Sequence, residues 1–307
     1  MNPARKRAYL ELILVAAIWG IASAVIKFGL RELTPFLFLT YRFFLTILIL
    51  LPFYLFSKNK SFGGIKKLPL ILLISVLTTT LNLGLLFLGT NLTTALDQSI
   101  IAASSPILVI FGGWLILHEH VTKREQLGIL ITILGTIIIT IQPLLHTTSE
   151  MGNLLGNLLV FGSNFAWVGY ALLAKKALRE GISPFNLTFV SFIVGFITCL
   201  PLAFLEVKNF NLIAPIVKIT LSAHLAVLYM AALSGGLAYY LYTKAQKTIE
   251  TSEASLFIYL QPIFTAPVAF FWLGEKFTWV FILGSVIVAA GVILAEWKKK
   301  RYNSSSV

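Results

Sequence analysis

The sequence predicts an all-α integral membrane protein of ten transmembrane helices, arranged as two inverted five-helix repeats around a central cavity. Of the 307 residues, 58% are hydrophobic and only 12% are charged, whereas soluble domains are nearer half apolar and a quarter charged. The apolar residues form long continuous segments, and residues of the same type recur at a fixed offset along the chain. So much apolar surface requires lipid as its solvent.

Ten apolar segments follow one another without room for a soluble domain between them. They lie at 8–30, 35–56, 68–90, 98–117, 127–142, 153–174, 185–205, 222–243, 254–273 and 277–297. Most are close to the roughly 20 residues that a helix needs to cross a bilayer core of about 30 Å. The segments are continuously apolar and do not alternate, which favours helices over a β-barrel.

The basic residues lie between these segments, and mostly on one side of the membrane. If the N-terminus is cytoplasmic, 18 of the 24 Lys and Arg residues fall inside and only four outside. This asymmetry follows the positive-inside rule and predicts that both termini are cytoplasmic, in a protein of the cytoplasmic membrane. It also accounts for the net charge of +12, so the lipid bilayer is the expected partner and nucleic acid is not.

The sequence contains an internal repeat. Pairs of like residues stand 156 positions apart at Pro106 and Pro262, Glu119 and Glu275, Gly128 and Gly284, and Gly135 and Gly291, and 148 apart at Trp19 and Trp167, and Lys27 and Lys175. We expect a first repeat at 1–143, a second at 152–297, and a basic cytoplasmic tail at 298–307. A unit of five helices that starts inside ends outside, so its copy is inverted. Inverted repeats typically hold a solute cavity near the midplane and alternate its access.

The segments 18–30, 34–44, 104–139 and 239–294 resemble the drug/metabolite transporter superfamily, and specifically its EamA-type ten-helix exporters. The features of that family are matched in both halves, at the Pro, Glu, Gly and Gly positions of each repeat. The resemblance implies a transporter similar to bacterial aromatic amino-acid exporters. It carries little information about the substrate, because the matching positions are architectural.

The expected cavity lining is aromatic and polar, with few fixed charges. Trp19 and Trp167 lie too deep in their segments for the interfacial aromatic belt, and a buried amide needs a partner or water. The candidate substrate-binding residues are Trp19, Asn82, Ser105, Asn164, Trp167, Tyr239, Tyr259 and Gln261.

Other residues carry more specific expectations. Pro106 and Pro262 should kink their helices near the middle, either as a static bend that improves packing or as a hinge beside the cavity. Arg42, about seven residues and therefore about 10 Å into its segment, is a possible partner for a solute carboxylate or for another helix. Lys27 should extend towards the lipid headgroups, and Asp97 should cap a helix.

Glu119 and Glu275 follow their segments at the membrane boundary. They are expected to cap loops beside Lys123 and Lys276. The inverted repeat places Glu119 on the cytoplasmic side and Glu275 outside, so the two carboxylates cannot form a shared pair.

Enzymatic chemistry is not expected. Asp97 is the single aspartate and no histidine is central to a segment, so neither an aspartyl pair nor a Ser/His pair can form in the membrane. Cys199 is the single cysteine, and no Cys/His spacing suggests a metal. We expect no metal and no cofactor.

These features predict a carrier that moves small metabolites by alternating access, with amino acids of aromatic or apolar character as the first expectation. Export or facilitated diffusion is favoured, because no carboxylate lies at the centre of a segment. Carriers for nucleobases or drugs, and a proton-coupled exporter, stay open as alternatives. Nucleotide sugars are disfavoured, because a phosphate requires several cavity Lys or Arg residues. The sequence leaves the oligomeric state open.

Overall fold

The computed structural model of the protein describes residues 3–56, 64–117, 123–142, 152–208 and 211–296. Within these ranges the chain forms helices and short connections, and no strand. Eight helical stretches are long and apolar enough to cross a membrane, and two shorter apolar helices, Gln126–Thr140 and Trp279–Leu294, complete the set. The all-α, ten-helix prediction is therefore confirmed. The boundary at 143, the residue Glu119 and the tail at 298–307 lie outside the described residues.

The ten membrane-spanning segments are called spans 1–10 in chain order, and several of them consist of consecutive helical pieces. Their elements are α1 (Pro3–Gly29); α2 (Pro35–Phe56); α3 (Leu68–Ser75), η2 (Val76–Leu83) and α4 (Gly84–Leu92); α5 (Ala95–Ala102) and α6 (Ser105–Leu117); α7 (Lys123–Thr140); α9 (Leu154–Arg179); α10 (Pro184–Val207); α12 (Leu221–Tyr229), η3 (Met230–Ala238) and α13 (Tyr239–Thr248); α14 (Thr251–Ser255), η4 (Leu256–Leu260), α15 (Gln261–Val268) and η5 (Ala269–Leu273); and α16 (Trp279–Glu296). The short helices η1 (Ile65–Lys67) and α11 (Ile213–Lys218) lie between spans.

Local sequence explains where several helices begin and end. Thr94 and Asn153 accept hydrogen bonds from the first-turn amides of α5 and α9, as N-cap side chains do. Pro184 stands at the first turn of α10, where its missing N–H costs nothing. Gly274 ends span 9 with φ at 71°, a left-handed conformation that glycine adopts without strain.

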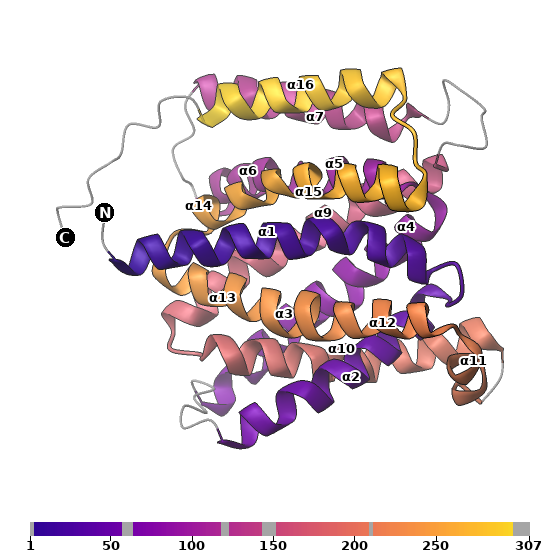
Figure 1. Ribbon diagram of the computed structural model, residues 1–307. Coiled ribbons are helices and arrows are strands. Elements are labelled where there is room, and N and C mark those ends of the chain that lie inside the picture. Colours follow the sequence, from indigo (N-terminus) through magenta and orange to yellow (C-terminus); the bar gives the residue numbers. More distant parts are fainter. Residues whose placement is uncertain (1–2, 57–63, 118–122, 143–151, 209–210, 297–307) are drawn as a thin grey trace.

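Helix contacts follow the inverted repeat. Spans 2 and 7 pack together as α2 with α10, and spans 5 and 10 as α7 with α16; span 1 packs on span 8, and span 3 on span 6. Exchanging each span with its counterpart five spans along the chain turns this set of contacts into itself, as a two-fold axis requires. Figure 1 shows α7 with α16 along one edge of the bundle and α2 with α10 along the opposite edge.

The repeated glycines let spans 5 and 10 cross closely. A Cβ on Gly135 would lie 2.8 Å from the backbone nitrogen of Val288, and one on Gly291 would lie 2.6 Å from that of Thr132. The two contacts are related by the 156-residue offset, since Thr132 corresponds to Val288. Small residues of this kind allow helix backbones to meet in lipid.

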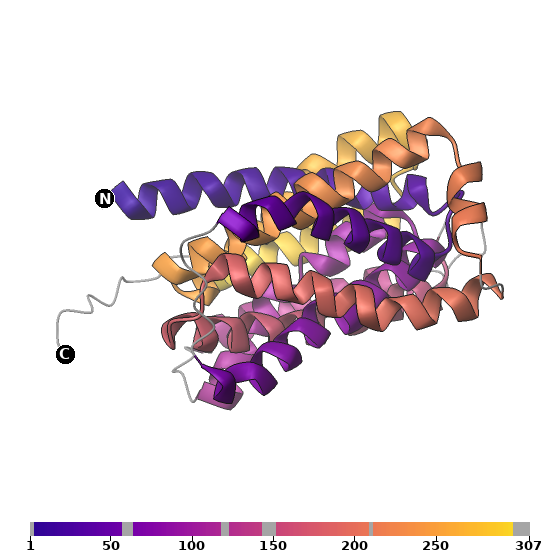
Figure 2. The ribbon, with the colours of Figure 1, turned by 90° about the horizontal axis from the view of Figure 1, so that it is seen from below.

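The helix axes run in one general direction in both views (Figures 1 and 2). We call the end of the bundle where α1 begins the near end, and the end where α1 finishes the far end. The last helix, α16, also finishes at the near end (Figure 1). The chain thus makes an even number of crossings.

The middle of spans 3 and 8 is irregular in both halves. The segments η2 and η3 are π-helical, and such widened turns are frequent at functional sites. Spans 4 and 9 are broken instead: a turn at Ala103 and Ser104 separates α5 from α6, and the 3₁₀ segment η4 precedes α15. In the sequence, only Pro106 and Pro262 indicate such interruptions, and they do so only for spans 4 and 9.

The prolines do not kink continuous helices as predicted. Pro106 and Pro262 are each the second residue of a helical piece, α6 and α15, that begins after the break. A proline is tolerated there because a first-turn amide has no intrahelical acceptor. Whether the breaks also act as hinges stays a prediction.

Lys27 and Lys175 occupy equivalent places at opposite ends of the bundle. Lys27 Nζ donates to the carbonyl oxygens of Thr90 and Asn91 at 3.1 Å each. Lys175 Nζ donates to those of Gln246 and Ile249 at 2.8 and 2.7 Å. Each ammonium therefore caps the C-terminal end of a span, where the helix dipole is negative. The expectation that Lys27 extends towards the headgroups is wrong.

These two lysines should matter equally for stability. Replacing either Lys27 or Lys175 by methionine leaves two carbonyls without their donor, and we expect each variant to lose about 1–3 kcal/mol. Thermal unfolding in detergent measures the loss. Lys176→Met is the matched control, since Lys176 is exposed and next to Lys175. A control as unstable as the two variants would contradict this assignment.

Candidate functional site

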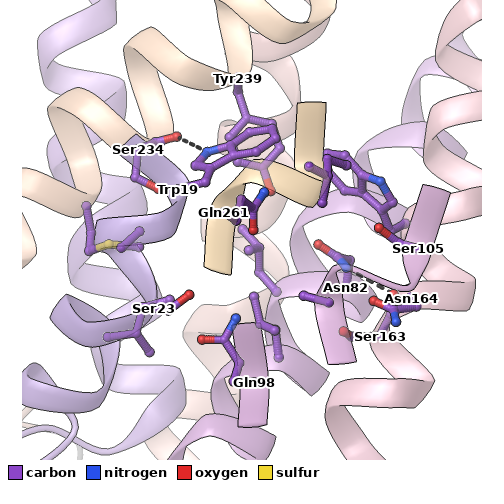
Figure 3. A pocket seen from close by; sticks show the side chains of 18 of the residues that line it. Trp19, Ser23, Asn82, Gln98, Ser105, Ser163, Asn164, Ser234, Tyr239 and Gln261 are labelled. Atoms are coloured by element: carbon purple, nitrogen blue, oxygen red, sulfur yellow. Dashed lines mark hydrogen bonds between the residues drawn. The ribbon is translucent and has the colours of Figure 1, made fainter. Parts of the chain in front are cut away.

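A cavity lies between the two repeats, in the middle of the bundle. About 80 Å³ of it is accessible to water, room for several water molecules or for part of a small solute. It is lined by Trp19, Ala22, Ser23, Ile26, Arg42, Asn82, Leu83, Leu86, Gln98, Ala102, Ser105, Ser163, Asn164, Trp167, Met230, Ser234, Tyr239, Ile258 and Gln261. These residues come from spans 1, 2, 3, 4, 6, 8 and 9, and Figure 3 shows the polar ones converging on a common space.

The structure brings together most of the residues that the sequence singled out. Trp19, Asn82, Ser105, Asn164, Trp167, Tyr239, Gln261 and Arg42 all line the cavity. Tyr259 does not, because it packs on a separate cluster formed by Ile107, Ile110 and Ile129. Pro106 and Pro262 stand next to the lining residues Ser105 and Gln261 without lining the cavity themselves.

The aromatic wall is built across the two-fold axis. The rings of Trp19 and Trp167 meet edge to face with centroids 5.5 Å apart, and Tyr239 lies 5.1 Å from Trp19. Tyr242 stands behind both indoles, 5.3 Å from each. Edge-to-face contacts of this kind are favourable. Here they hold two repeat-related tryptophans against each other.

Arg42 is the single cation among the described lining residues, and no described acid forms an ion pair with it. Its side chain is 1% exposed. Nη2 donates to Ser234 Oγ at 3.4 Å, and the guanidinium lies 5.7 Å from the Phe87 ring. Its Nε and Nη1 have no acceptor among the described residues. A buried guanidinium without a carboxylate is costly, so this one presents an unmet demand for an anion.

The two asparagines hold the scaffold while facing the cavity. Asn164 Nδ2 donates to Ile101 O at 2.8 Å and to Ser104 Oγ at 3.1 Å, and so satisfies a carbonyl at the break in span 4. Asn82 Nδ2 donates to Ser163 O at 3.0 Å. Their amide nitrogens are therefore committed to neighbouring spans, which leaves their oxygens as the groups available to a solute.

Four polar lining residues were not predicted: Ser23, Gln98, Ser163 and Ser234. Gln98 is buried and its Oε1 has no partner. Ser234 joins Arg42 to Trp19, because its carbonyl accepts from Trp19 Nε1 at 3.2 Å. Small hydroxyl residues are common in membrane helices, so no sequence signal distinguishes these serines. Gln98 did have a sequence signal, because it is an amide in an apolar segment next to the single aspartate.

No carboxylate lines the cavity within the described part of the chain. The site thus offers one fixed positive charge, several neutral amides and hydroxyls, and an aromatic wall. Trp167 Nε1 is a further donor without an acceptor. This combination suits a small solute with one acidic group and an apolar or aromatic remainder.

The far end of the bundle is tied together by Glu275. Its Oε1 accepts from Ala95 N at 2.7 Å and its Oε2 from Leu96 N at 2.9 Å. It thereby caps the first turn of α5, across the two-fold from its own repeat. Burial raises the pKa of Glu275, while the two backbone donors and nearby Lys27 oppose that shift. The prediction of a local loop cap beside Lys276 is wrong: the carboxylate joins span 9 to span 4.

Removing this link should loosen the far end. We expect Glu275→Ala to cost about 0.5–2 kcal/mol, the usual range for losing an N-terminal cap, because two half-buried amides lose their acceptor. Glu32→Ala is the matched control, since Glu32 binds Thr220 N at 2.7 Å in a similar way but is exposed. Thermal unfolding compares them. A larger loss for Glu32→Ala would contradict the assigned role.

The comparisons with known proteins agree with this architecture. The model of the EamA-like transporter family matches residues 6–141 and 154–297, one match to each half of the chain. An uncharacterized transporter of Archaeoglobus fulgidus is 27% identical over 293 residues, covering 95% of this chain and 98% of its own. The uncharacterized transporter YetK of Bacillus subtilis is 27% identical, with coverage of 96% and 88%. A WAT1-related protein of Arabidopsis thaliana is 23% identical, with coverage of 97% and 86%.

A solved crystal structure shares the fold, with a TM-score of 0.64 over 93% of this chain and 95% of the other, at 16% identity. The two family matches together cover most of the chain, and the curated relatives are aligned over nearly their whole length. The protein is an integral membrane transporter, and not an enzyme. The chain belongs to the EamA-like transporter family, within the drug/metabolite transporter superfamily.

Proposed function

We propose that this transporter carries small metabolites with one carboxylate and an apolar or aromatic remainder, amino acids above all, by alternating access. The observation that carries the proposal is Arg42, buried in the cavity wall with two N–H groups lacking an acceptor. A guanidinium matches a carboxylate with two parallel hydrogen bonds. A solute carboxylate would supply the charge that no described side chain supplies.

The rest of the lining suits the other parts of an amino acid. The oxygens of Gln98 and of the cavity asparagines are acceptors for an ammonium group, and the Trp19–Trp167–Tyr239 wall is a surface for an apolar side chain. A solute bearing phosphate would require more cations than Arg42 alone provides. This argues against nucleotide sugars.

The orientation follows from charge. The near end of the bundle carries Arg5, Arg7, Lys67, Lys175 and Arg179, and we assign it to the cytoplasm. Under this assignment both termini are cytoplasmic, and Glu275 and Lys27 stand at the outer end. The inverted repeats allow the same cavity to open first to one end and then to the other.

Counterflow into liposomes tests the proposal. Vesicles holding the purified protein and unlabelled L-phenylalanine should take up labelled L-phenylalanine faster than empty vesicles. They should ignore labelled phenylalaninamide, which lacks the carboxylate. Equal uptake of both would contradict a role for the carboxylate, and uptake of labelled adenine alone would support the nucleobase alternative instead.

A further inference from the structure

Among the residues that the structure describes, Asp97 is an acid buried outside the cavity. Asp97 is the third residue of α5 and is 2% exposed. The sequence suggested that it caps this helix, but Thr94 does so, accepting from Asp97 N at 3.0 Å. The Asp97 carboxyl lies near the Asn157 amide and the Thr93 hydroxyl, and its Oδ2 has no hydrogen-bond partner among the described residues. A carboxyl in this place is not needed to begin the helix.

The N-terminus of α5, where the helix dipole is positive, already binds a carboxylate. Glu275 accepts from the backbone N–H groups of Ala95 and Leu96, so the helix terminus that would stabilise an anion at Asp97 binds a different one. An ionised Asp97 would stand beside a second carboxylate at the start of the same helix. Two carboxylates that share a site repel each other, and this repulsion disfavours the ionisation of one of the two groups.

In the described part of the chain, the elements packed against α5 place no cation in ion-pair contact with Asp97. Spans 1, 3, 5, 6 and 9 surround the helix. Span 9 contributes Glu275 after its end, and span 1 contributes Lys27 and Arg31, both of which act on Glu275. The side chains that reach Asp97 from spans 3 and 6, Thr93 and Asn157, are neutral.

The hydrogen bonds around Asn157 use the polar hydrogens that lie close to Asp97. Asn157 Nδ2 donates to Ile139 O at 3.1 Å and to Thr140 O at 3.2 Å, which fixes the orientation of the amide. Its Oδ1 then accepts from the Thr93 hydroxyl. A hydroxyl has one hydrogen, so Thr93, which gives its hydrogen to Asn157, has none left to donate to the Asp97 carboxyl.

Asp97 is also one residue away from the cavity. Gln98, which follows it, lines the cavity with an unpartnered Oε1. The first turn of α5 therefore contains the Glu275 contact at Ala95 and Leu96, the buried acid at Asp97, and a lining residue at Gln98. A change at Asp97 acts at once on the far-end link and on the solute site.

The inverted counterpart of Asp97 is Glu253, 156 positions on. It pairs with Arg5 at 2.5 Å, receives a hydrogen bond from Tyr9, and has a side chain 25% exposed. Both repeats thus hold an acid at this place. At the near end the acid has a cation and access to solvent, and at the far end it has neither.

From this geometry we propose that Asp97 is a proton-binding site, through which the carrier exchanges protons for its solute. With the proton bound, Glu275 docks on α5, as in this structure, and holds the far end closed. When the proton leaves, two negative charges meet at the start of α5, Glu275 is repelled, and the far end opens. A proton returning from outside restores the closed form. This inference rests on the proposed function and replaces facilitated diffusion with proton exchange.

Transport in liposomes separates the two proposals. Counterflow of labelled L-phenylalanine without a pH gradient tests the carrier itself. With an imposed gradient, the wild type should also accumulate the label against its own gradient, up to about tenfold per pH unit for one proton exchanged. Asp97→Asn, which resembles the protonated acid and should therefore hold the far end closed, should lose the accumulation and slow the counterflow. Glu32→Gln, an exposed acid at the same end, should behave as the wild type.

Three results would overturn this inference. If an imposed pH gradient does not change the uptake of label by the wild type, the carrier does not exchange protons. If Asp97→Asn accumulates the label as well as the wild type does, Asp97 does not couple transport to protons. If Glu32→Gln alone loses the accumulation, the coupling does not involve Asp97. If the wild type shows no counterflow, the proposed function is contradicted. The protonation of Asp97 is then tested by a measurement that needs no solute.

Infrared spectroscopy of the protein in lipid at neutral pH is that measurement. The wild type and Glu32→Gln should show the C=O stretch of a protonated carboxyl, and Asp97→Asn should lack it. A wild-type spectrum without a band that this substitution removes would show that Asp97 is ionised, and the proposal would be wrong.

Discussion

Replacing Arg42 by glutamine should weaken the binding of L-phenylalanine by about 30-fold or more, because truncating one partner of a buried charge pair costs about 2–5 kcal/mol. The guanidinium lies in the cavity wall with Nε and Nη1 unpartnered, so the solute carboxylate would lose its one cationic contact. Binding is measured by the solute-dependent rise in unfolding temperature, since a ligand that binds only the folded state stabilises it.

Two comparisons make this result specific. Arg42→Lys keeps the charge but not the planar pair of donors, and we expect it to bind more weakly than the wild type and more tightly than Arg42→Gln. Without solute, Arg42→Gln should unfold at or above the wild-type temperature, because a buried unpaired cation is removed. Unchanged affinity in Arg42→Gln would show that the arginine only supports the structure.

The crossing of spans 5 and 10 should be the part of the fold least tolerant of an added methyl group. We expect Gly135→Ala and Gly291→Ala each to lose about 1–3 kcal/mol of stability, as overpacking does. The new Cβ would lie 2.8 Å from the backbone nitrogen of Val288 in the first and 2.6 Å from that of Thr132 in the second. Backbone atoms on a packed helix cannot move aside as a flexible side chain can.

Gly162→Ala is the control for this pair. Gly162 also lies in a spanning helix, α9, but the nearest atom to its Cβ is Leu85 Cδ1 at 4.0 Å. The substitution should leave stability unchanged or raise it slightly, because alanine favours the helix more than glycine does. If thermal unfolding in detergent ranks the three variants alike, the close crossing is not what the repeated glycines provide.

The sequence was sufficient for the features that lipid and duplication dictate. Continuous apolar segments reveal spans because the bilayer core imposes their length. The 156-residue offset marked the glycines of the crossing as architectural positions, and the depth of Trp19 and Trp167 in their segments predicted an aromatic cavity wall. Each of these signals is local or strictly periodic, so one chain without its fold is enough to read it.

Features that depend on contacts between distant spans were not predictable. Glu275 looked like a loop residue, and only the fold shows that it binds the start of α5. Lys27 looked like a residue that reaches the headgroups, and it caps span 3 instead. The π-helical segments η2 and η3 were not foreseen, and Tyr259, in η4, packs against Ile107 and Ile110 and not in the cavity wall. In each case the deciding partner is far away in sequence.

Chemical labelling of a single cavity cysteine tests the central claim, that one cavity between inverted repeats opens in turn to each end. Cys199 is the one native cysteine and is buried, so Cys199→Ala with Ser105→Cys gives a single reporter in the lining. A membrane-impermeant maleimide should label it from either side of the membrane, with L-phenylalanine changing the two rates in opposite directions. Labelling from one side only, or rates from both sides that rise together with solute, would contradict alternating access.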